Sequence, residues 1–364
     1  MKRTASPAIF YFLFVATGVG VMLLGALAPA LQLHQNDAQI GSLLAAQFTG
    51  QVVGALLVGR TPYRSLQFGL FLAALSATAI GLMHTPWWPV LFVYGLGMGI
   101  TMTATNIAAG METSVQERVS RLEMLNAVWP LGAMCAPLLI RARPDPGMRL
   151  YLCVAALVML GLVWASLRPN GVMDTKTIET NKQMSFAWNL ILLCVLGLLA
   201  VGVETAVSNW SSLFGMRYFP GTRAITLAPV VFWLGMLTGR SLASRLSESV
   251  AWFPLMLMSS LVAAAAITVT SFSNSSAMLV VATFACAVCV GPLYPAVLGQ
   301  CVMLPGKNLV FFAAGVGSAI VPWLLGAFST AIASLRIAFL LPVVLALMIP
   351  VILMTQKSSY RKQR

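Results

Sequence analysis

One carboxylate stands inside a long apolar run. The run covers about residues 186–214, and Glu204 lies in it within the stretch VGVETAVSNW, which ends at Trp210. A charge at the centre of a membrane-spanning helix costs about 2.5–3.5 kcal/mol on insertion scales, so an ionisable side chain there is a functional hypothesis by default. Glu204 is therefore a candidate for binding protons or a polar solute. The alternative is that its carboxyl group only holds this helix to a neighbour by a hydrogen bond.

The residues that follow Glu204 make one face of that helix polar. With about 3.6 residues per turn, Ser208 and Ser211 fall beside Glu204, and Asn209 lies further round the helix. This pattern predicts that the face lines a hydrated cavity. Trp210 falls on the apolar side, where its ring either stacks on a solute or anchors the helix near the membrane boundary.

Other apolar runs contain uncharged polar and aromatic residues. Amides, hydroxyls and aromatic rings suit a neutral, polyhydroxylated ligand, through hydrogen bonds and ring stacking. The same groups routinely make hydrogen bonds between membrane helices without touching a ligand, so both readings stay open. The candidates for solute binding or proton coupling are Glu204, Asn209, Trp210, Ser208, Gln47, Gln51, Asn106, Asn126, Trp129 and Tyr294.

The composition assigns the chain to the membrane. Of its 364 residues, 59% are hydrophobic and 9% are charged, against about 25% charged in soluble domains. The net charge of +13 lies in short segments between apolar runs, which sets orientation in a membrane and does not indicate nucleic acid. We find no nucleotide-binding loop, catalytic triad or zinc spacing, and the CxxC spacing of Cys286 and Cys289 lies in an apolar run. We expect no enzyme, no cofactor and no metal site.

Twelve apolar runs are long enough to cross a bilayer, which takes about 20 residues. The polar segment 168–185 divides them into two halves of six, over 1–167 and 186–364. The sequence thus predicts an all-α membrane protein with twelve transmembrane helices in two pseudo-symmetric halves. The expected spans are roughly 9–33, 38–59, 66–84, 87–111, 122–140, 149–167, 186–214, 223–243, 250–270, 277–302, 308–330 and 335–355.

The two halves repeat in parallel. A shift of 185 residues carries Gly50 and Gly54 onto Gly235 and Gly239. The same shift carries Gly132 onto Gly317, together with the prolines five residues further on. Parallel six-helix repeats are a transporter architecture, with the solute site near the membrane midplane. We expect the paired glycines to let helices approach closely.

The distribution of Lys and Arg predicts the orientation. If the N-terminus is cytoplasmic, most of the 22 cations fall in cytoplasmic segments, as the positive-inside rule requires. We therefore expect both termini in the cytoplasm and 168–185 as a cytoplasmic linker, in a multi-pass protein of the inner (plasma) membrane. The exceptions on the outer side are Arg141, Arg143, Arg149, Arg217, Arg223 and Arg336.

Over its whole length the chain resembles the major facilitator superfamily. The stretch GALLVGRTPYR, from Gly54 to Arg64, looks like that family's cytoplasmic loop signature, with Val58 near the place of the usual Asp. The stretch GRSLASR, from Gly239 to Arg245, looks like the second copy. In the family these loops lock the two halves together, so the resemblance implies a gating role for Arg60, Arg64, Arg240 and Arg245.

Three stretches are similar to the branch of fucose:proton symporter-like sugar transporters. They are GVETAVSNW from Gly202, GPLYPAVL from Gly291 and LNAVWPLGAMCAPLL from Leu125. The sugar symporters of this branch carry an acidic residue in their first span, and the run 9–33 has none. If transport is coupled to protons, Glu204 has no obvious substitute.

These features predict a secondary active transporter that takes up a small polar solute, foremost a sugar, by proton-coupled alternating access. The expected partners are the solute, protons and the lipid bilayer, with the chain acting as a monomer. One alternative is an exporter of drugs or metabolites, although the Gly-Pro-x-x-Gly-Gly run of such exporters is absent around Pro137. A second alternative is a membrane sensor that has lost transport.

Overall fold

A computed structural model describes residues 7–32, 34–58, 61–83, 87–111, 115–142, 148–167, 185–246, 252–301 and 307–361. These residues form helices and connecting turns, with no strand among them. By their contacts the chain divides into two compact units. Unit 1 is Met1–Leu31 with Ser42–Lys176, and unit 2 is Gln32–Gly41 with Thr177–Arg364. The division falls within the predicted linker 168–185. Unit 2 also includes Gln32–Gly41, of which the last five residues are the first five of the second helix.

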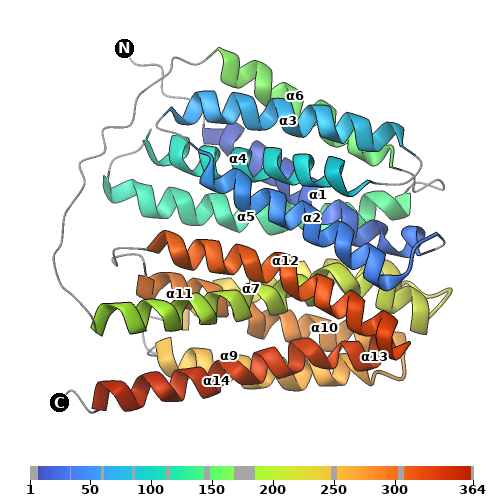
Figure 1. Cartoon of the computed structure of the whole chain (residues 1–364), viewed down its shortest axis with the longest axis vertical. Helices are drawn as coiled ribbons and strands as arrows, with labels where there is room; N and C mark the ends of the chain where they lie inside the picture. Colours follow the sequence, from blue (N-terminus) through green and yellow to red (C-terminus); the bar gives the residue numbers. More distant parts are fainter. Residues whose placement is uncertain are drawn as a thin grey trace. The chain divides into compact units, whose positions relative to one another are not determined.

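The first six helices run side by side along one direction (Figure 1). Five of them lie in unit 1, whereas α2 begins in unit 2 and continues into unit 1. Their bounds are α1 Pro7–Leu31, α2 Asp37–Leu56, α3 Pro62–Leu82, α4 Trp88–Met111, α5 Val115–Ala142 and α6 Leu150–Ser166.

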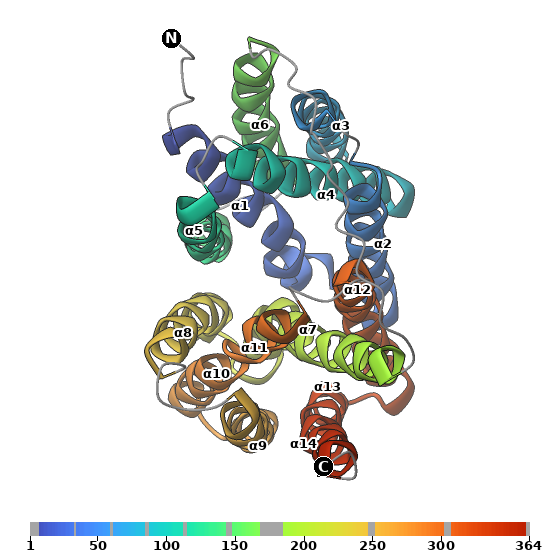
Figure 2. The same ribbon diagram turned by 90° about the vertical axis from the view of Figure 1, so that its left-hand side faces the viewer.

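The remaining helices belong to unit 2. Viewed along their axes, α8, α9 and α10 group together and α7 lies against α12 (Figure 2). We call the end of unit 2 at which α7 finishes the Tyr218 end. The bounds are α7 Ser185–Tyr218, α8 Ala224–Leu246, α9 Trp252–Ser271, α10 Ser276–Val290, α11 Leu293–Cys301, α12 Lys307–Ile332, α13 Leu335–Ala338 and α14 Leu340–Arg361.

The predicted twelve-span helical fold is confirmed. Within the described residues, nine helical stretches are long and apolar enough to cross a bilayer, and Ala127–Ala142 and Leu150–Ser166 are shorter apolar ones. Helix α2, with 20 residues, is of spanning length but is not among these nine stretches. Helices suit this setting because a backbone in hydrocarbon must satisfy its own hydrogen bonds.

Two predicted spans are each interrupted once. The span expected at 277–302 is α10 followed by α11, because Pro292 and Pro295 carry no N–H to continue the helical ladder. Gly291 still donates to the carbonyl of Ala287 at 2.9 Å, so the interruption is local. The span expected at 335–355 begins with the short α13, which is capped by Ser334, and resumes as α14.

The glycine repeat corresponds to a repeat of helix contacts. A methyl group added at Gly54 would overlap the carbonyl oxygen of Leu96 in α4, and one at Gly239 would overlap that of Val288 in α10. In the same way, Gly132 of α5 lies against the α1 backbone and Gly317 of α12 lies against the α7 backbone. The predicted close approach of helices at these glycines is confirmed. The 185-residue shift therefore relates two pairs of equivalent helix contacts.

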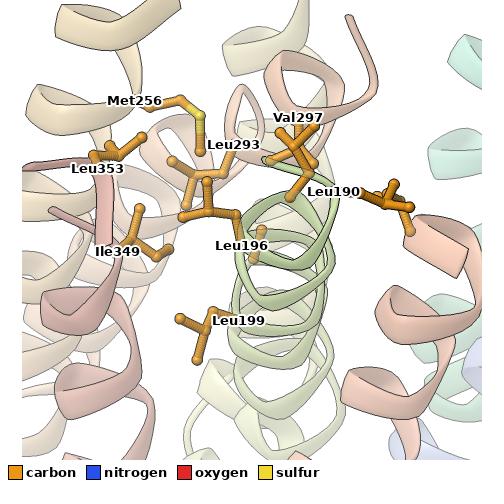
Figure 3. Close-up of a cluster of buried hydrophobic side chains, with 11 residues drawn as sticks. Leu190, Leu196, Leu199, Met256, Leu293, Val297, Ile349 and Leu353 are labelled. Atoms are coloured by element: carbon orange, nitrogen blue, oxygen red, sulfur yellow. The ribbon is translucent and has the colours of Figure 1, made fainter. Parts of the chain in front are cut away.

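A leucine-rich cluster forms part of the core of unit 2 (Figure 3). It joins α7, α9, α11, α12 and α14 near the end of the unit where α7 begins. In unit 1 a second cluster collects Phe10, Phe14, Tyr63 and Leu125, with Trp129 packed against it. The residues of the unit 2 cluster are Leu190, Leu193, Leu196, Leu199, Ala200, Met256, Leu293, Val297, Val310, Ile349 and Leu353.

Candidate functional site

Glu204 is paired with an arginine inside unit 2. Its Oε2 lies 3.4 Å from Nη2 of Arg240, which comes from the neighbouring α8. The Glu204 side chain is 11% exposed and that of Arg240 is 26% exposed, so the pair is largely withdrawn from solvent. The Nε of Arg240 is buried and has no hydrogen-bond acceptor among the described residues. Two opposite charges thus meet within spans, joined by a single contact.

The polar face beside Glu204 is buried, and its hydroxyls bond mostly to their own helix. Ser208 donates to the carbonyl of Thr205 at 3.3 Å, and Ser211 donates to that of Ser208 at 3.0 Å. The Asn209 amide donates to the same Thr205 carbonyl at 2.8 Å. Its own oxygen, also buried, accepts no hydrogen bond from the described residues. The hydroxyl oxygens and this amide oxygen are therefore available as acceptors, while the hydrated cavity remains a prediction.

Trp210 lies in the interior of unit 2. Its side chain is fully buried, and its Nε1 donates to the carbonyl of Pro322 in α12 at 3.1 Å. The ring also lies directly over Gly326, where a methyl group would come 2.9 Å from the indole. These contacts give the indole a packing partner within its own unit. They favour a structural contribution from Trp210.

Substitution of Trp210 tests that contribution. We expect Trp210→Ala to lower the free energy of unfolding by about 3–5 kcal/mol, as large buried aromatics do when truncated. Trp210→Phe keeps most of the packing and loses one hydrogen bond, at about 1 kcal/mol. The midpoint of thermal unfolding in detergent measures both. If Trp210→Phe abolishes transport without moving the midpoint, the indole contacts the solute and the structural interpretation fails.

Gln47 and Gln51 lie one turn apart on α2. The Gln47 side chain is fully buried, and its Nε2 donates to the carbonyl of Val21 in α1 at 2.8 Å. Its Oε1 and the Nε2 of Gln51 have no hydrogen-bond partner among the described residues. Gln47 therefore makes an interhelical bond in unit 1, and each residue keeps one polar atom for another partner.

Three further predicted residues make contacts within their own helices or clusters. Asn106 of α4 donates to the carbonyl of Met102 at 3.1 Å, within its own helix. Trp129 of α5 is partly buried and packs against the aromatic cluster of unit 1. Tyr294 of α11 is partly buried and packs against the leucine-rich cluster of unit 2. Their contact with a solute remains a prediction.

The structure describes the side chains of only two of the four predicted gating arginines, Arg64 and Arg240. Arg64 is exposed in the first turn of α3, and the guanidinium of Arg240 is directed to Glu204. Arg60 lies outside the described residues, as do the side chains of Arg245 and Asn126. A gating role for the four arginines stays a prediction.

A second ion pair, which the sequence did not predict, lies at the Tyr218 end of unit 2. Asp37, the first residue of α2, accepts two hydrogen bonds from Arg217 near the end of α7, at 2.6 and 2.8 Å. Asp37 is 5% exposed, and Ser329 of α12 also donates to it. Each residue on its own resembles a charge at a span end, and 180 residues separate the two partners. The one available signal was an acid with no neighbouring cation at the start of a span.

The sequence matches a known family model. The model of the Major Facilitator Superfamily aligns with residues 10–310, well over half of the chain. The chain belongs to the major facilitator superfamily. It is accordingly a membrane transporter, as the resemblance of its loops and halves predicted, and not an enzyme.

Sugar transporters occur among the similar proteins of this family. The glucose/mannose transporter GlcP of Bacillus subtilis (strain 168) is 20% identical over 348 residues, which are 87% of this chain and 86% of that one. The structure of the E. coli fucose:proton symporter FucP has a TM-score of 0.65 and 18% identity, covering 96% of this chain and 98% of that one.

A solved structure of a transporter that is not named for a sugar has a similar fold as well. A bacterial homologue of the human lysosomal transporter Spinster has a TM-score of 0.77 and 14% identity, covering 98% of this chain and 97% of that one. At these identities the structural matches show the fold alone.

Proposed function

We propose that this protein takes up a small polar solute, foremost a sugar, by alternating access coupled to protons. The observation that carries the proposal is the ion pair of Glu204 and Arg240 within the spans of unit 2. Glu204 would bind the coupling proton and Arg240 would bind the solute when its partner is neutralised. The sugar relative and the sugar-branch motifs support this solute class.

Stability alone is a weak reason for such a pair. Withdrawing two charges from water costs several kcal/mol each, and well-packed apolar residues are often as stable or more so. Arg240 and Glu204 touch at a single 3.4 Å contact, and one nitrogen of Arg240 has no acceptor among the described residues. A pair held so loosely in a low-dielectric setting is suited to exchange of partners.

The exchange couples proton and solute through one guanidinium. Arginine stays charged at all accessible pH values, so only Glu204 changes charge when a proton arrives. A protonated Glu204 no longer attracts Arg240, whose N–H groups can then donate to hydroxyl oxygens of a sugar. By linkage, a solute bound to Arg240 favours the proton on Glu204 by the same factor. Proton and solute would therefore bind together and leave together.

The neighbouring side chains supply complementary acceptors. The hydroxyl oxygens of Ser208 and Ser211 and the free amide oxygen of Asn209 lie on the same helix as Glu204, within two turns. A sugar hydroxyl donates as well as accepts, so donors from Arg240 and acceptors from α7 together match a polyhydroxylated molecule. None of these groups requires the solute to carry a charge.

The location and orientation complete the proposal. The excess of Lys and Arg in alternate loops supports cytoplasmic termini in an inner (plasma) membrane, with the chain working as a monomer. In this orientation the Tyr218 end of unit 2 faces outward. An inward proton gradient would then drive uptake.

Transport assays in proteoliposomes test the proposed function. Purified protein would be given labelled hexoses and pentoses with and without an inward proton gradient, with empty liposomes as the control. We expect the gradient to drive accumulation of at least one sugar above its external concentration. If no sugar accumulates under any gradient and cells expressing the protein resist a toxic compound, the protein is an exporter. If neither occurs, the proposed uptake of a sugar fails.

A further inference from the structure

Two tyrosine hydroxyls are buried in the interior of unit 1. Tyr94 of α4 and Tyr151 of α6 are both 0% exposed. Their rings meet edge to face, with centroids 5.3 Å apart and an interplanar angle of 80°. Neither hydroxyl oxygen has a hydrogen-bond partner among the described residues. Buried hydroxyls normally have a partner, because a hydroxyl that leaves water without a replacement bond costs stability.

The hydroxyl of Tyr94 lies against α1 at Gly20. A methyl group added at Gly20 would overlap the Tyr94 oxygen, so this oxygen lies directly on the backbone of α1. The same methyl group would meet side-chain carbons of Met98 and Val154. Carbon atoms offer the hydroxyl no hydrogen bond, so its surroundings here do not satisfy it.

A third polar atom lies at the next residue of α1. Gln47 of α2 is fully buried, and its Nε2 donates to the carbonyl of Val21 at 2.8 Å. Its Oε1 accepts no hydrogen bond from the described residues. The backbone of Gln47 lies against Gly95 of α4, the residue that follows Tyr94. Gln47 and Tyr94 thus reach consecutive residues of α1 from two neighbouring helices.

The three side chains gather where several helices of unit 1 meet. Helix α1 contacts both α4 and α6 (Figure 2), and the bond from Gln47 joins α2 to α1. All of these residues belong to unit 1. We call Gln47, Tyr94 and Tyr151 the polar triad. Each member has one buried polar atom that no described residue satisfies.

The chemistry of the polar triad suits water. A tyrosine hydroxyl both donates and accepts, and an amide oxygen accepts. Water also donates and accepts, so it can join groups that do not reach one another directly. All three groups are uncharged and offer no counter-charge to an ion. Buried waters typically make about three hydrogen bonds to polar groups that are otherwise unsatisfied.

We propose that the polar triad binds ordered water, which links α2, α4 and α6 beside α1 in the interior of unit 1. The water donates to Oε1 of Gln47 and exchanges hydrogen bonds with the two tyrosine hydroxyls. The site assigns Gln47 to the internal structure of unit 1 and not to contact with a solute. It does not rest on the identity of the solute or of the coupling ion.

Radiolytic labelling of the natural protein tests for this water directly. A short X-ray pulse makes hydroxyl radicals from water, bound water included, and these radicals oxidise the adjacent aromatic rings. Mass spectrometry should find Tyr94 and Tyr151 oxidised several-fold more than Phe14. Phe14 is the matched control because it is fully buried in the aromatic cluster of the same unit. Oxidation of the two tyrosines no higher than that of Phe14 would overturn the proposal.

The same measurement separates bound water from bulk water. The protein is mixed with heavy-oxygen water just before the pulse, so that bulk water is heavy while bound water is still light. Trp88, which is 60% exposed at the start of α4, should acquire the heavy isotope at once. Tyr94 and Tyr151 should acquire it later. Equal timing would mean that bulk water reaches the tyrosines freely, and this would contradict an ordered site.

Removal of the hydroxyls gives a test by the sign of a shift. Tyr94→Phe and Tyr151→Phe keep the rings, so each should lower the midpoint of thermal unfolding by about 2–4 °C if its hydroxyl is bonded to water. A hydroxyl that is buried without a bond would give a rise when removed. The double variant should lose less than the sum, because both changes disturb the same water. A rise, an unchanged midpoint or losses that simply add would overturn the shared site.

Gly20→Ala tests the position of the site. The added methyl group takes the place of the Tyr94 oxygen, so Gly20→Ala should lower the unfolding midpoint of the natural protein. In a chain that already carries Tyr94→Phe, the oxygen is gone and the same change should lower the midpoint less. Equal losses in the two chains would show that the hydroxyl does not lie at Gly20, and the proposed site would fail.

Discussion

Glu204→Gln is expected to abolish accumulation of solute against its gradient while exchange of solute across the membrane continues. The amide has nearly the shape of the protonated carboxyl group but cannot release a proton, so the variant resembles the solute-binding form permanently. Arg240 then remains free to bind solute in both directions of the cycle. Labelled solute should reach equal concentrations inside and outside, with or without a pH gradient. Counterflow in proteoliposomes measures the retained exchange.

Arg240 variants separate coupling from folding. Arg240→Gln leaves Glu204 buried without its cation, which is strongly destabilising when a buried pair loses one partner. The double variant with Glu204→Gln carries no unpaired charge and should regain part of the thermal stability. If Glu204→Gln instead accumulates solute as the natural protein does, Glu204 is a structural residue and the coupling proposal is wrong.

Gly95→Leu is expected to prevent assembly of unit 1. Even a methyl group at Gly95 of α4 would overlap the carbonyl oxygen of Gln47 in α2, and backbone cannot yield as a flexible side chain can. Overpacking a core costs about 1–3 kcal/mol and occasionally more, and a leucine at a backbone contact belongs to the costly end. Fluorescence-detected size-exclusion chromatography should show little folded protein at the position of the natural chain.

Gly197→Ala is the matched control for this prediction. Gly197 also lies inside a long helix, α7, but its nearest neighbour atom would be 3.4 Å from an added methyl group, an ordinary contact. Alanine there should be tolerated and slightly stabilising, since alanine exceeds glycine in helix propensity by about 1 kcal/mol. Normal yield of Gly95→Leu beside a normal Gly197→Ala would contradict the close α2–α4 contact.

Much of the fold could be predicted from one sequence because membrane helices leave a strong signal. The run at 186–214 became a helix that continues to Tyr218, and the shift relating Gly54 to Gly239 marked equivalent helix contacts. The break after Val290 was not predicted, although Pro292 and Pro295 stand there. Hydropathy registers an apolar run and is insensitive to a missing N–H within it.

The sequence alone could not predict which residues the charged side chains would pair with. The helical wheel placed Glu204 on a polar face but could not say which neighbouring helix would meet it. Arg240 was assigned to a gating loop by resemblance, and its guanidinium is directed to Glu204. Asp37 and Arg217 stand at the ends of two different helices, and only tertiary packing brings such residues together. Periodicity within a helix gives no information on such pairs.

The central claim is that Glu204 and Arg240 couple a proton to each solute. Solute-driven proton movement tests it most directly, in proteoliposomes that hold a pH-sensitive dye and have no initial pH gradient. An inward sugar gradient should acidify the interior with the natural protein, and Glu204→Gln should admit the sugar without acidification. Sugar entry without acidification in the natural protein, or unchanged acidification with Glu204→Gln, would contradict the account.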